Sequence, residues 1–217
     1  MCGALVFAMS AAPLASSDGW GAVDEMAMRE MLEGQNGRRE AWSSAPSLVV
    51  INNVLDYTQG STSSGFTALE QTLSEKELNQ LEADLTDALY ELTGGTVESF
   101  KSITVESAER GSVVGIVRPG QIVVARFRDV QSKTGNIGLG GRMTHGASIV
   151  GGAVMLDAAF DTKSDQRHLL RTHELGHALG YNHVESRSSI MNARVGSTIS
   201  DFDRAAIRAA FDVDGLH

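Results

Sequence analysis

This 217-residue chain has a single cysteine, and it lacks long apolar runs and an excess of basic residues. The single cysteine, Cys2, excludes any disulfide within the chain. No apolar run approaches the roughly 20 residues that a membrane-spanning helix needs. The formal charge is -9, with 18 basic against 27 acidic residues, so there is no basic tract to release counterions from phosphates. We therefore expect neither a membrane span nor a nucleic-acid partner.

What is present is the composition of a soluble globular domain, with 42% hydrophobic and 21% charged residues. The length suits one domain, which we place at residues 46–217. Residues 1–45 are expected to form an N-terminal extension. Within it, "ALVFAMSAAPLA" (4–15) has the length of a signal-peptide core, but the first basic residue is Arg29. A secretory signal, a short pro-segment and a plain apolar arm therefore all stay open.

The order of apolar patterns along the chain predicts an α/β fold. β-branched, apolar segments predict strands at 47–55, 100–107, 121–130, 142–149 and 152–160. Helical spacing of apolar residues and helix caps predict helices at 73–94, 164–180 and 200–213. The first of these helices carries a capping box at Ser74 and Glu77. The glycine-rich stretch "SKTGNIGLGG" (132–141) predicts a loop; because a strand follows it instead of a helix, a phosphate cradle is disfavoured.

The stretch "THELGHALGYNHV" (172–184) carries three histidines at informative spacings. His173 and His177 are four residues apart, so a helix places both imidazoles on one face, where they can bind one metal ion. Glu174 lies about 100° around the helix, which suits a carboxylate that faces the ion without binding it. Gly180 can take a left-handed conformation, so that the chain turns and His183 reaches the same ion. Three neutral histidines leave one tetrahedral position for water, as in catalytic zinc sites.

This motif, followed by a methionine in "SRSSIMN", resembles the signature of the metzincin zinc peptidases. "HELGHALG" and "SDFDRAAIRAAF" are similar to the matrixins within that clan. The resemblance covers roughly residue 46 to the end and implies a zincin-like α+β fold. Such a fold has a twisted mixed sheet of about five strands, an active-site helix, a Met-turn and a C-terminal helix. For this chain, the resemblance implies that Met191 forms an apolar floor beneath one catalytic Zn²⁺.

The resemblance also implies where a protein or peptide substrate binds. An extended substrate would pair with an edge strand, which we expect within 142–148, and residues 192–200 would wall the side-chain pocket. Val184 departs from the Ser or Thr of matrixins and leaves the subfamily open. Matrixins hold a structural zinc by an Asp and three His, whereas here His145 alone could correspond and Met155 occupies a ligand-like position. We expect no second zinc, and calcium stays open at three acidic positions, Asp129, Asp157 and Asp161.

The function that these features imply is that of a zinc-dependent endopeptidase with Glu174 as general base. A non-catalytic zinc scaffold is an alternative, although loss of the glutamate would be its signature. A zinc amidase acting on small amides or cell-wall peptides is a second alternative. A latent precursor, with residues before Ser47 covering the cleft, is a third. Because most metzincins act outside the cell, we expect a secreted protein, and a monomer by default.

Overall fold

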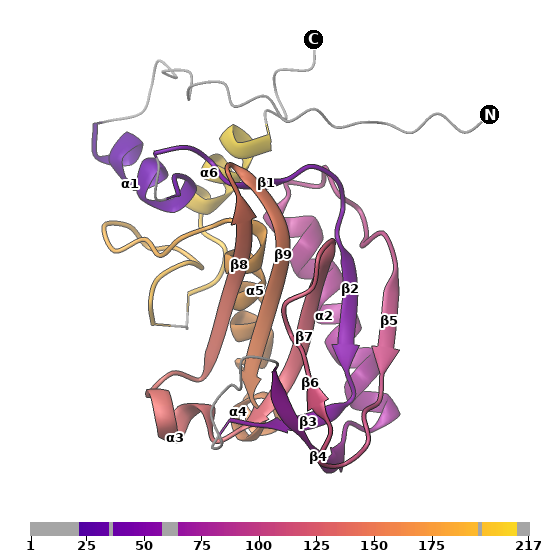
Figure 1. Cartoon of the computed structure of the whole chain (residues 1–217). Coiled ribbons are helices and arrows are strands. Elements are labelled where there is room, and N and C mark those ends of the chain that lie inside the picture. Colours follow the sequence, from indigo (N-terminus) through magenta and orange to yellow (C-terminus); the bar gives the residue numbers. More distant parts are fainter. Residues whose placement is uncertain (1–21, 35–36, 58–64, 195–196, 212–217) are drawn as a thin grey trace, which may run out of the picture.

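The computed structural model describes residues 22–34, 37–57, 65–194 and 197–211 (Figure 1). It is a mixed α/β structure in which several helices pack on a mixed sheet. The apolar run at 4–15 and the last two residues of the helix predicted at 200–213 lie outside the described residues. Within the described ranges, no helix has both the length and the apolar character to cross a membrane. The predicted fold class is therefore confirmed at the level of a mixed α/β sheet protein.

The body of the sheet has five strands. In the spatial order given next, four adjacent strands are parallel to one another, and the fifth, at the edge, is antiparallel to its neighbour. Their spatial order is β5 (Ile103–Glu106), β2 (Ser47–Ile51), β7 (Gln121–Arg128), β9 (Ser148–Asp157) and β8 (Gly138–His145). Four further strands bring the described sheet to nine: β1 (Ala41–Trp42), β3 (Asn53–Asp56), β4 (Phe66–Thr72) and β6 (Val113–Val114). Four of the five predicted strands overlap one body strand each: 47–55 overlaps β2, 100–107 overlaps β5, 121–130 overlaps β7 and 152–160 overlaps β9.

Two of the predicted segments around β8 were wrong. The predicted strand at 142–149 is a hairpin instead, because Gly146 takes a left-handed φ of 65° and turns the chain between β8 and β9. The predicted loop at 132–141 contains the last residues of the helix α3 (Val130–Thr134) and the first residues of β8. Asn52 likewise divides the predicted strand 47–55 into β2 and β3. The predicted strand at 152–160 ends at Asp157, which caps the helix α4 (Ala158–Lys163).

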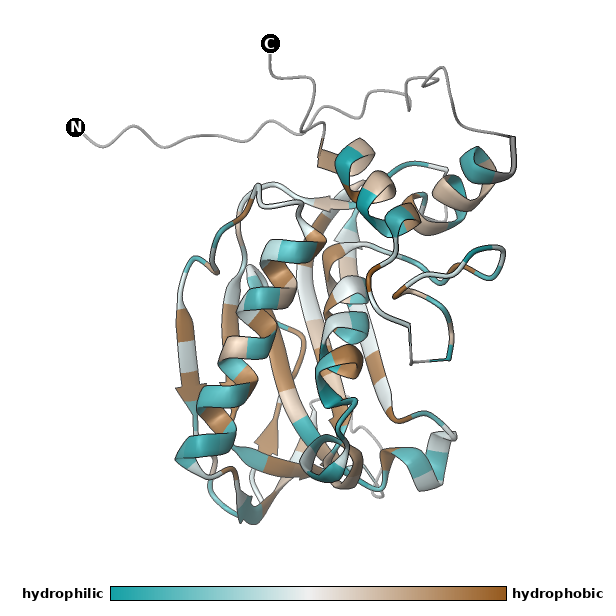
Figure 2. Cartoon of the chain, turned by 180° about the vertical axis from the view of Figure 1, so that it is seen from behind, coloured by the Kyte–Doolittle hydropathy of each residue, from teal (hydrophilic) through white to brown (hydrophobic). Residues whose placement is uncertain are grey.

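Two long helices, α2 (Glu75–Leu92) and α5 (Arg167–Leu179), cover one face of the sheet (Figure 2). The predicted capping box of α2 is present, since the Glu77 N–H donates to Ser74 Oγ and the Ser74 N–H donates to the Glu77 carboxylate. The apolar sides of both helices and of the sheet form one core, in which Leu85, Leu89 and Leu175 are fully buried. The helices α1 (Ala22–Leu32) and α6 (Asp201–Phe211) pack together at one end of the molecule (Figure 1).

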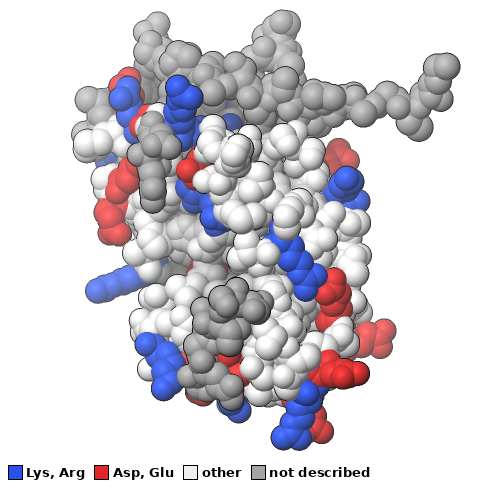
Figure 3. Space-filling model, in the orientation of Figure 1, with Lys and Arg blue, Asp and Glu red and all other residues white. Residues whose placement is uncertain are grey.

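The opposite face of the sheet has a second apolar cluster. Phe66 and Phe127 meet edge to face there, with ring centroids 4.8 Å apart, and Val114 and Ile116 are buried against them. Figure 3 views the molecule from this side: basic and acidic side chains are interspersed, and the described residues show no continuous basic tract on this face.

A buried ion-pair network connects the sheet to the helices. Asp161 of α4 has no exposed surface and accepts from Arg126 Nε of β7 at 2.6 Å and from Arg171 Nε of α5 at 2.7 Å. Arg126 also pairs with Glu77, and Arg171 with Asp84, both on α2 and both at 2.6 Å. The network therefore joins four elements and fixes the position of α5, from which the candidate site residues project.

Candidate metal centre

The three histidines of the motif converge on one point. The Nε2 atoms of His173 and His177 lie 3.2 Å apart, and that of His183 lies 3.0 Å from His177 and 3.3 Å from His173. Nitrogens on a tetrahedral zinc with bonds of about 2.0–2.1 Å would be about 3.3–3.4 Å apart. Within the described residues, these three form the one group of His, Cys, Asp or Glu side chains placed to share a metal ion.

The hydrogen bonds of two rings determine where their protons are. Nδ1 of His173 lies 2.7 Å from the carbonyl oxygen of Ile190, and Nδ1 of His177 lies 2.9 Å from that of Tyr181. A carbonyl only accepts, so each Nδ1 carries the proton of a neutral ring and each Nε2 presents a lone pair. Burial lowers the pKa of His173. Burial and the neighbouring His173 lower the pKa of His177 to about 3. Both shifts favour neutral rings.

Two lone pairs that face each other at 3.2 Å repel, and a cation between them removes the repulsion. The donor set of three imidazoles suits zinc, among other divalent transition metals. The carbonyl partners at Nδ1 are the interactions that orient metal-binding histidines in general. The residues present therefore fit a zinc ion.

Gly180 ends α5 and redirects the chain toward His183. It takes a φ of 113°, and its position leaves no room for a side chain because a Cβ would collide with the backbone oxygen of Glu40. The Tyr181 N–H then bonds to the oxygen of Gly176 at 3.0 Å, and the Tyr181 hydroxyl bonds to the oxygen of Leu92 at 2.6 Å. The exit from the helix is thus fixed by both α5 and α2.

Glu174 projects from α5 toward the edge strand β8 and is only 4% exposed. Burial raises the pKa of Glu174 to about 8, against the opposing effect of a hydrogen bond from the Gly140 backbone. A cation held by the histidines would lower this pKa, because a nearby positive charge favours the carboxylate. A Cβ on Gly138 would lie 2.6 Å from Oε1 of Glu174, and one on Gly140 would collide with the Glu174 carbonyl oxygen. The glycines therefore allow β8 to approach α5 at the carboxylate.

Met191 lies beneath α5, in a turn from Ser189 to Asn192, and has no exposed surface. A Cβ on Gly176 would lie 2.6 Å from its Sδ, so this glycine allows the close contact. Val184, which follows the third histidine, is also fully buried, and its N–H donates to the Met191 oxygen at 3.0 Å. Val184 thus belongs to the same buried apolar layer as Met191.

Asp203 of α6 is a supporting residue that the sequence analysis did not single out. It is fully buried and accepts from the hydroxyl of Ser189 and, at 2.9 Å, from the N–H of Ile190. The Ile190 carbonyl in turn binds His173, so α6 is connected to a histidine of the site through one residue. The Ser200-x-x-Asp203 spacing of a helix cap is present, but it gives no sign of this second role.

The remaining predicted positions lie outside the histidine cluster. Asp161 belongs to the ion-pair network, Asp157 accepts three backbone N–H groups, and Asp129 is exposed. His145 is exposed at the end of β8, and Met155 is partly buried in β9.

Comparison with protein-family models finds no match, and comparison with curated proteins finds none either.

Proposed function

We propose that the chain is a zinc-dependent endopeptidase of metzincin type, with His173, His177 and His183 as ligands. The observation that carries the proposal is the convergence of three Nε2 atoms within 3.3 Å, two of them with lone pairs directed at each other. The sequence motif and the methionine beneath the helix support the same conclusion.

Glu174 is the residue that moves protons in this proposal. A zinc ion at the three histidines would supply a Lewis acid, which lowers the pKa of a water and polarises a carbonyl. Glu174 accepts the proton of the attacking water and delivers it to the leaving amine. The Gly140 N–H holds the carboxylate in place, and burial of the carboxylate keeps bulk water from competing for the proton.

The edge strand β8 is the proposed binding surface for the peptide. Among the described strands β8 pairs with β9 alone, so its other edge is free to pair with an extended chain. Its glycines at 138 and 140 lie against Glu174, which favours this upstream part over the segment 142–148. Backbone pairing binds peptides with little sequence preference, so side-chain selectivity would come from the segment 192–200, of which residues 195 and 196 lie outside the described residues.

Metal analysis and a mixed peptide library test the proposal. We expect one zinc per chain, and cleavage that a chelator abolishes and added zinc restores. Glu174→Gln should keep the zinc and lose cleavage by about 10²–10⁴-fold, because it keeps the shape but cannot accept the proton. Full cleavage by this variant would refute the assigned role.

His168 supplies a matched control, since it is an exposed histidine on the same helix. His177→Ala should lose zinc, whereas His168→Ala should bind zinc and cleave like the parent. Zinc binding without cleavage of any peptide would favour a non-catalytic scaffold. Cleavage confined to small amides or cell-wall peptides would favour an amidase.

A further inference from the structure

The third ligand differs from the other two in how it is held. His173 and His177 project from α5, and a carbonyl oxygen fixes each ring at Nδ1. His183 is exposed and lies on the loop after the helix, and no described residue forms a hydrogen bond to its Nδ1. The position of its ring therefore depends on how the backbone on either side of it is anchored.

The α1 region anchors this loop immediately before His183. The Asn182 N–H donates to the carbonyl oxygen of Met31 at 2.9 Å. The side-chain amide of Asn182 donates to the carbonyl oxygen of Glu33 at 2.8 Å. One residue of the loop thus makes two bonds to the end of α1.

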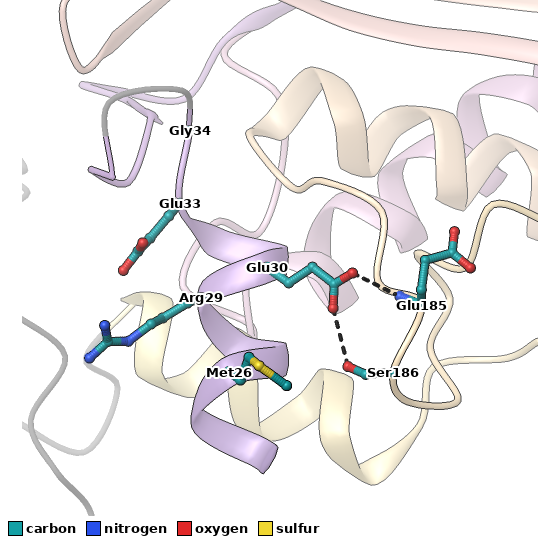
Figure 4. Close-up of a pocket in the computed structure, with 7 residues that line it drawn as sticks. All are labelled: Met26, Arg29, Glu30, Glu33, Gly34, Glu185 and Ser186. Atoms are coloured by element: carbon teal, nitrogen blue, oxygen red, sulfur yellow. Dashed lines mark hydrogen bonds between the residues drawn. The ribbon is translucent and has the colours of Figure 1, made fainter. Parts of the chain in front are cut away.

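The same helix anchors the loop again after His183. One oxygen of Glu30 accepts the N–H of Glu185 and the other accepts the hydroxyl of Ser186, both at 3.1 Å (Figure 4). Six residues earlier on α1, Asp24 pairs with Arg187 at 2.7 Å. The Glu30 contacts border an open pocket (Figure 4). One wall of this pocket is α1, and the other is the loop that follows His183.

We infer that Glu30 and Asp24 are positioning residues for the third metal ligand, so that α1 is part of the metal site. This inference rests on the proposed function, because it needs a metal at the three histidines. It makes α1 a permanent part of the active protein and not a segment to be removed. By linkage, metal binding and the docking of α1 strengthen each other to the same degree.

Zinc affinity, measured by competition with a chelator, tests the inference without relying on activity. The variants are Glu30→Ala, Glu30→Gln and the double variant Asp24→Ala/Glu30→Ala. Glu25→Ala is the matched control, since Glu25 is an exposed acidic residue in the first turn of α1. We expect the zinc Kd to rise about tenfold in the double variant and less in Glu30→Gln, which keeps one accepting oxygen. The control should equal the parent.

A merely structural role would give a different result. It would lower stability equally with and without zinc and would leave the zinc Kd unchanged, which would overturn the inference. Hydrogen exchange on the parent needs no variant: zinc should slow exchange of the Asn182 and Glu185 N–H groups, and equal rates would overturn it. A parent that binds no zinc would overturn the proposed function as well, so the two failures are distinguishable.

Discussion

The contact between Gly138 and Glu174 predicts a measurable coupling between the two positions. A methyl group on Gly138 would lie 2.6 Å from Oε1 of Glu174 and 2.9 Å from its Cδ and Cγ. The strand or the carboxylate would have to shift by about 0.8 Å to restore ordinary contact. Such overpacking destabilises the folded state by about 1–3 kcal/mol. Replacing glycine by alanine also lowers the conformational entropy of the unfolded chain, which stabilises the fold by about 0.4–1 kcal/mol. We therefore expect Gly138→Ala to lower the free energy of unfolding by about 1–2 kcal/mol.

A double-mutant cycle separates this contact from general strand effects. Glu174→Ala removes all three colliding atoms, so Gly138→Ala should be neutral or stabilising in that background, a coupling of at least about 1 kcal/mol. Urea unfolding of the parent, both single variants and the double variant, all with chelator present, measures it. Gly141→Ala is the control, because a Cβ there would meet nothing within 4 Å. An equal cost of Gly138→Ala in both backgrounds would refute the reasoning.

Three further predictions follow from residues around the site. Asp203→Asn keeps one acceptor but loses the negative charge that binds two backbone N–H groups. Denaturant unfolding should therefore show a free energy of unfolding lower by about 2–3 kcal/mol, and competition with a chelator should show weaker zinc binding. Hydrogen bonds from Ser74, then Arg126, lower the pKa of Glu77 from 4.5 to about 2. Its contribution to stability is therefore complete above pH 4.5 and lost as the pH falls toward 2, and urea midpoints of Glu77→Gln should fall less steeply over that range. Gly180→Ala should cost about 2 kcal/mol or more in thermal unfolding, because it combines a positive φ with a backbone collision.

The sequence was sufficient to predict the three histidines as a set because their geometry is local. Helix periodicity places His173 and His177 on one face, and a glycine is the ordinary end of a helix, so the sequence predicts that the chain turns back before His183. The orienting partners could not be predicted in the same way. The Ile190 carbonyl and the Asp203 carboxylate reach the site only through the packing of α6 against the turn, and no spacing encodes that contact.

The glycine-rich stretch was misassigned for an equally physical reason. Glycines in sequence indicate either a turn or a close approach of another element, and only the folded chain shows which. At Gly135 the cause is a turn with positive φ at the end of α3. At Gly138 and Gly140 the cause is the proximity of α5, so residues 138–141 are the start of a strand. The long helix α2, whose cap and leucine spacing are both local, was predicted within two residues at each end.

The buried charges that hold α5 also limit how this protein can change. Arg126, Asp161 and Arg171 are all buried, and Asp161 pairs with both arginines. Removing one member breaks at least one buried ion pair, at a cost of about 3–5 kcal/mol, although replacing the whole set by apolar residues can be neutral. Evolution by single substitutions would have to pass through these destabilised variants before it reached the fully apolar set. We therefore expect homologues to keep these charges together or to have exchanged them together, and an alignment with independent variation at the three positions would contradict this.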